Sequence, residues 1–160
     1  MKATLILGVI LLFIPTAEAR SIEGYGEVGF GDSLQEVRGI YPELKQELSG
    51  RMWACDLEAP FIPHAEALFL FSEQNTLNFI SISGFLTKAH ELPDALLANA
   101  LVEKYGTADS VKEVWTRMFG TCTHAIWTDA QGNRLWLSLY HASQKVYLEY
   151  VSAAMAQPRK

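Results

Sequence analysis

The sequence predicts an α+β fold in which helices cover one face of an antiparallel sheet. Three observations predict it: apolar residues recur at helical spacing in two segments, apolar and polar residues alternate in several short runs, and polar turns join neighbouring runs. The order is a helix followed by strands, and it occurs twice. Helices and hairpin strands in this order favour helices packed on one face of the sheet.

The first helix is expected to begin at Ser33, which can cap it, with Glu36 completing a capping box. Pro42 ends or kinks this helix. A second helix is expected to begin near Pro93 and to end at Gly106, where a C-terminal cap belongs. The segment before the first helix is rich in glycine and is expected to be a loop or short edge strand, while the tail after Ser152 is expected to fray.

Seven strands are expected between and after these helices. A polar turn at 72–76 joins two of them, and a strong turn at 129–133 joins two others. The expected strands are 51–57, 66–71, 77–82, 111–118, 123–128, 134–140 and 145–151. The two helix-plus-strands segments also correspond in detail, since Trp53 and Trp115 each follow a helix by a similar distance. We interpret this as a degenerate duplication of a helix-plus-strands unit.

Residues 1–19 have the parts of a secretory signal peptide. Lys2 supplies a positive charge, residues 3–14 form an apolar run, and Ala17-Glu18-Ala19 offers small residues to signal peptidase. The run is shorter than the about 20 residues of a membrane-spanning helix. We expect cleavage after Ala19, a mature chain of residues 20–160 that folds as a single α+β domain without a membrane span, and a periplasmic or secreted location.

Composition narrows the class of partner. The chain has a net charge of −5, and no cluster of basic residues offsets it. Nucleic acids and anionic membrane surfaces are therefore poor partners, and neutral or basic ones are favoured. Hydrophobic residues make up 49% of the chain, which is enough for a substantial core.

Cys55 and Cys122 are the two cysteines of the chain. An even number of cysteines in an exported protein favours a disulfide between them. The alternative is a pair of buried free thiols.

One motif suggests catalysis. Gly31-Asp32-Ser33-Leu34 resembles the nucleophile block of the GDSL esterases and lipases, which implies Ser33 as a nucleophile. That family also needs an aspartate three residues before its catalytic histidine, and this chain has none. A helix cap, by contrast, explains Asp32, Ser33 and Glu36 together. The histidines are scattered without the spacing of a metal site, so we expect no metal and no cofactor. They are His64, His90, His124 and His141.

The last two strands alternate in a way that gathers aromatic residues. Leu135, Leu137 and Leu139 suit the face under the helices. Trp136, Tyr140 and Tyr147 then share the opposite face, with Trp127 expected nearby. Clustered Trp and Tyr side chains are typical anchors of protein-binding surfaces. The alternative is that a loop, the N-terminal segment or a second subunit covers them as ordinary core.

The residues 31–37 and Lys104-Tyr105-Gly106-Thr107 resemble the helix patterns of the exported beta-lactamase-inhibitory-protein and SmpA/OmlA type. The resemblance implies an α+β protein whose free sheet face recognises a partner. The chain lacks the lipidated cysteine of the outer-membrane lipoprotein members.

These observations favour a non-enzymatic binding module, an adaptor or inhibitor, that meets a protein partner through its aromatic sheet face. One alternative is a periplasmic small-ligand carrier whose aromatic rings line a pocket between sheet and helices. Another is a serine hydrolase using Ser33. The sequence does not define the oligomeric state.

Overall fold

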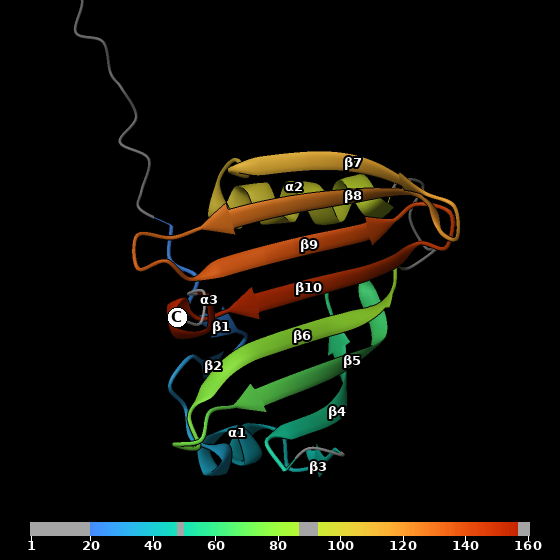
Figure 1. The fold of residues 1–160 in the computed structure, drawn as a ribbon. Coiled ribbons are helices and arrows are strands. Elements are labelled where there is room, and N and C mark those ends of the chain that lie inside the picture. The colour runs from blue at the N-terminus through green and yellow to red at the C-terminus, as the bar shows by residue number, and fades with distance from the viewer. Residues whose placement is uncertain (1–19, 48–49, 87–92, 157–160) are drawn as a thin grey trace, which may run out of the picture.

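The computed structural model describes residues 20–47, 50–86 and 93–156. The expected signal peptide and His90 lie outside these ranges. The described part is an α+β fold built on an eight-stranded antiparallel sheet (Figure 1), with the order β3-β4-β5-β6-β10-β9-β8-β7. Its strands are β3 (Lys45–Gln46), β4 (Met52–Ala59), β5 (Ile62–Phe71), β6 (Leu77–Phe85), β7 (Ser110–Thr116), β8 (Gly120–Thr128), β9 (Arg134–Tyr140) and β10 (Lys145–Val151).

Three helices and a small hairpin complete the described part. The helices are α1 (Leu34–Ile40), α2 (Pro93–Tyr105) and α3 (Ala153–Ala156), and the hairpin pairs β1 (Gly24–Tyr25) with β2 (Val28–Gly29). The predicted strands 134–140 and 145–151 are confirmed to the residue, whereas β5 begins four residues before the predicted 66. Within the tail that was expected to fray, residues 153–156 instead form α3. Among the described helices, none combines the length and apolar character needed to cross a membrane.

The two halves of the sheet meet between β6 and β10. One half is α1 followed by β3 to β6, and the other is α2 followed by β7 to β10. The two final strands pair antiparallel, with Ile82 opposite Leu148. The predicted order of helix and then strands is thus confirmed in both halves, while their origin by duplication stays a prediction.

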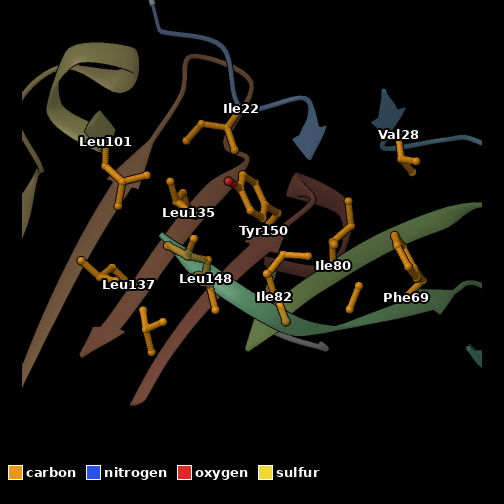
Figure 2. Packing of buried hydrophobic residues seen from close by; sticks show 14 of the residues in the cluster. Ile22, Val28, Phe69, Ile80, Ile82, Leu101, Leu135, Leu137, Leu148 and Tyr150 are labelled. Atoms are coloured by element: carbon orange, nitrogen blue, oxygen red, sulfur yellow. The ribbon is translucent and has the colours of Figure 1, made fainter. Parts of the chain in front are cut away.

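One face of the sheet carries the hydrophobic core. Leu137, Leu148, Ile82 and Ala67 lie side by side on β9, β10, β6 and β5, and each is almost fully buried. Val37 of α1 and the inner side of α2 belong to the same buried cluster, so both helices cover this face. Figure 2 shows Leu101 of α2 beside the leucines of β9. We call this side the core face and the other the open face.

The start of α1 is the predicted capping box. The Ser33 hydroxyl accepts a hydrogen bond from the Glu36 backbone N–H (3.3 Å), and the Ser33 N–H donates to the Glu36 carboxylate (2.7 Å). This backbone bond, together with a bond from the Ser33 hydroxyl, lowers the pKa of Glu36. The cap satisfies N–H groups that the first turn of a helix cannot pair internally.

The N-terminal segment packs against the core face. The side chains of Ile22 and Val28 are buried (Figure 2), and the ring of Tyr25 meets that of Tyr150 with centroids 5.8 Å apart. Gly24 has a φ of 154°, and a Cβ there would collide with the Val28 carbonyl, so the tight hairpin needs glycine. The segment therefore contributes to the core, which the prediction of a loop or edge strand did not include.

The predicted disulfide between Cys55 and Cys122 is wrong, because both residues are buried free thiols. Cys55 on β4 pairs with Ala67 on the core face, whereas Cys122 on β8 pairs with Tyr140 on the open face. Four strands separate β4 from β8, which amounts to about 24 Å at the usual strand spacing. A disulfide requires Cα atoms within roughly 7 Å.

Candidate functional site

The open face of β9 and β10 gathers the three aromatic residues that the alternation predicted. Trp136 lies opposite Glu149, Tyr140 opposite Lys145, and Tyr147 opposite Ser138. All of these positions share one face, because they alternate with the buried leucines of β9 and the buried Val146, Leu148 and Tyr150 of β10. Trp136 is 40% exposed, and the two tyrosines are half-buried.

The rings of Tyr140 and Tyr147 are in contact, and a further ring, that of Phe119, contacts Tyr140. Tyr140 meets Tyr147 edge to face with centroids 6.0 Å apart, and Phe119 meets Tyr140 in the same manner at 5.5 Å. Phe119 belongs to the turn between β7 and β8 and is 53% exposed. We call Phe119, Trp136, Tyr140 and Tyr147 the aromatic patch. Such edge-to-face pairs hold the rings of Phe119, Tyr140 and Tyr147 in defined orientations, so this part of the patch is preorganised.

Trp127 is not part of the aromatic patch, contrary to the prediction. It lies opposite the buried Leu135 on the core face and is 2% exposed. Its indole N–H donates to the Gly106 carbonyl at 2.8 Å, just beyond the end of α2. Trp127 therefore joins α2 to the sheet and does not face a partner.

Charged groups flank the patch on both sides. The Lys145 ammonium lies over the Tyr147 ring, 4.9 Å from its centroid, which is a cation–π contact. Lys145 in turn lies opposite Phe85, which is 58% exposed at the end of β6. Glu149 lies on the other side of Tyr147, directly beside Trp136.

Glu149 is a half-buried carboxylate. Its open-face neighbours are Tyr147 and Val151 along β10, Trp136 on β9, and Ser81 on β6. Burial raises the pKa of Glu149, and its carboxylate makes no hydrogen bond or ion pair with any residue in the described ranges. A desolvated carboxylate beside exposed rings is an unusual feature of a surface, and sequence reasoning had not selected it.

Ser33 does not lie in a catalytic arrangement among the described residues. Its hydroxyl contacts Glu36, in the capping box. Of the described histidines, His64 contacts Glu58, and His124 contacts Ser138 at 3.0 Å. None of these contacts involves Ser33.

His141 has a hydroxyl on one side and a carboxylate on the other. Its Nε2 lies 2.8 Å from the Thr123 hydroxyl, while its Nδ1 lies 3.7 Å from the Asp94 carboxylate. The second distance exceeds that of a hydrogen bond, which a catalytic triad needs to orient its imidazole. We therefore interpret the contact with Thr123 as support for the β9–β10 turn.

Two members of this surface could not be selected from the sequence. Phe119 belongs to a turn, and the direction of a turn side chain depends on the turn geometry and not on a period of two. Glu149 follows the alternation of β10, but its isolation from cations depends on the neighbouring strands.

The comparisons with known proteins identify no family for this chain. No protein-family model and no curated protein matches it. A crystal structure of a DUF4309 family protein, YjgB from Bacillus subtilis, is similar, with 13% identity, a TM-score of 0.45, and coverage of 74% of this chain and 78% of that one. The resemblance to the beta-lactamase-inhibitory-protein and SmpA/OmlA type is wrong, because the structural match is to this other family. A likeness this distant carries no function to the chain.

Proposed function

We propose that this protein is an exported, non-enzymatic binding module, and that the aromatic patch on its open face meets a protein partner. The observation that carries the proposal is the presence of four aromatic side chains on a face that α1 and α2 leave uncovered. Both α1 and α2 pack on the core face, and the N-terminal segment packs there too. The alternative that this segment covers the patch therefore loses its support.

The chemistry of the patch suits protein recognition. Trp and Tyr side chains bring a large contact area at a low entropic cost, and they dominate the energetics of protein interfaces. Trp136 and Phe119 already expose about half of their surface, and edge-to-face contacts hold the tyrosines in place. A partner would bury these rings without first having to rearrange them.

The carrier alternative required the same rings to line a pocket between sheet and helices. Trp136, Tyr140 and Tyr147 instead lie on the face opposite α1 and α2. The space between sheet and helices is filled by apolar side chains such as Leu101, Leu135 and Leu137 (Figure 2). The binding-module proposal fits this geometry better.

Site-specific photocrosslinking tests the proposal. The photoreactive analogue p-benzoylphenylalanine would replace Phe119, and cells of the native host would be irradiated. We expect a crosslinked adduct of defined mass that disappears when Trp136→Ala or Tyr147→Ala is added. Trp115→Ala is the matched control, since Trp115 is 71% exposed but points to the other face, opposite Thr121. Equal adduct yields in all variants would overturn the proposal.

We also infer that the two halves derive from one ancestral unit of a helix and four strands. Their identical element order supports this, and so does the meeting of their last strands at the centre of the sheet. Homologous sequences aligned half against half should then show matching positions above the level found for shuffled halves.

A further inference from the structure

We propose that Glu149 and Trp136 form a subsite for a cationic side chain, lysine or arginine, presented by the protein partner. The inference rests on the proposed function and specifies the chemistry of the partner. It is carried by the juxtaposition, directly across the strand pair, of an exposed indole with a half-buried carboxylate that pairs with no described residue.

The surroundings of Glu149 favour a cation over any neutral group. Residues directly opposite each other in antiparallel strands have Cβ atoms about 5 Å apart, so one ammonium or guanidinium group can touch both the carboxylate and the indole ring. A cation is attracted both by the face of the indole ring and by the negative charge of the carboxylate. Ser81, across from Glu149 on β6, places a hydroxyl group on the same face beside the carboxylate.

The lysines and arginines of the described residues do not occupy this subsite. Lys145 is four residues away along β10, about 13 Å in a strand, and its ammonium lies over Tyr147. Arg134 lies opposite Val151, one diagonal step from Glu149, and forms no ion pair with it. Glu149 therefore bears a desolvation cost that nothing in the described ranges offsets.

The Lys145 contact shows that the aromatic patch can hold an ammonium. Its approach to Tyr147 is an internal example of the interaction proposed for Trp136 and Glu149. The net charge of −5 also favours a basic partner, because it attracts positively charged proteins at long range.

The test uses small probes, so it does not require the partner. The purified protein, labelled with ¹⁵N, is titrated with Nα-acetyl-arginine amide and Nα-acetyl-lysine amide, and the indole N–H signal of Trp136 is followed by NMR. Nα-acetyl-glutamine amide is the neutral comparison. We expect saturable shifts with the two cations at millimolar concentrations. The affinity of Glu149→Gln for both cations should be at least about fivefold lower. Glu113→Gln, which changes an exposed carboxylate on β7, should leave the titration unchanged.

Two outcomes would overturn the subsite: equal shifts with the neutral probe, or cation binding of unchanged affinity in Glu149→Gln. The melting temperature of each variant confirms that it is folded. The crosslinking experiment separates this failure from that of the proposed function. If Glu149→Gln keeps the crosslinked adduct and Trp136→Ala loses it, the patch binds a partner without a cation at Glu149. If no variant affects the adduct, the proposed function itself fails.

Discussion

Trp127 and Trp136 lie on neighbouring strands one step out of register, and their rings point to opposite faces of the sheet. Trp136 is paired with Ile126, and Trp127 is paired with Leu135. The pleat therefore buries one indole against α2 and leaves the other 40% exposed on the open face.

Because of this relationship, we expect the same substitution, tryptophan to phenylalanine, to affect the free energy of unfolding very differently at the two positions. Trp127→Phe removes the N–H that bonds the Gly106 carbonyl and leaves a small cavity, so we expect a loss of about 2–3 kcal/mol in the free energy of unfolding. Trp136→Phe should change it by less than about 0.5 kcal/mol. Urea denaturation of both variants measures the difference, and similar values for the two would contradict the assignment of faces.

We expect the carboxylate of Asp129 to make a contribution to stability that is lost in acid. Burial alone would raise the pKa of its carboxylate, but bonds from Ile22, Gln131 and Asn133 outweigh burial and lower it. A group whose pKa is lower in the folded state stabilises the fold above its unfolded pKa, about 3.9, and loses that contribution as pH falls through the folded value.

We therefore expect Asp129→Asn to reduce the free energy of unfolding by about 2 kcal/mol at pH 7. The difference from the unsubstituted protein should shrink as pH falls below about 4. Asp94→Asn, at a partly exposed carboxylate, is the control. A difference that is independent of pH would show that the charge of Asp129 does not contribute.

The cysteines should behave as two buried thiols. Burial raises the pKa of both Cys55 and Cys122, so little reactive thiolate forms at neutral pH. We expect a thiol reagent to label neither residue in the native protein and both residues after unfolding in urea. The intact mass before reduction should correspond to two thiols. A mass two hydrogens lower, which returns on reduction, would contradict the placement of the cysteines on opposite faces.

Ser33 should act on stability and not on catalysis. Ser33→Ala removes the cap of α1 and should cost about 1 kcal/mol, whereas Ser33→Asp should restore most of it because aspartate also caps. A fluorophosphonate probe should label neither Ser33 nor Thr123. Labelling that Ser33→Ala or Thr123→Val abolishes would favour a hydrolase.

Local signals account for the parts of the fold that were predicted well. The capping box at Ser33 and Glu36 depends on residues three apart, and the cap at Gly106, with a φ of 74°, depends on the freedom of glycine. The alternation in β9 and β10 likewise requires nothing beyond the strands themselves, so the shared face of Trp136, Tyr140 and Tyr147 could be predicted. These features arise within a few residues of the chain.

The tertiary structure decided the remainder. The face that Trp127 occupies depends on the register across the 129–133 turn, and a shift of one residue reverses every side chain of a strand. The distance between Cys55 and Cys122 depends on the joining of the two halves at β6 and β10, so that four strands separate them. The isolation of Glu149 depends on which side chains the neighbouring strands bring beside it. In each case the deciding contacts join residues far apart in the chain, and no local pattern in the sequence encodes them.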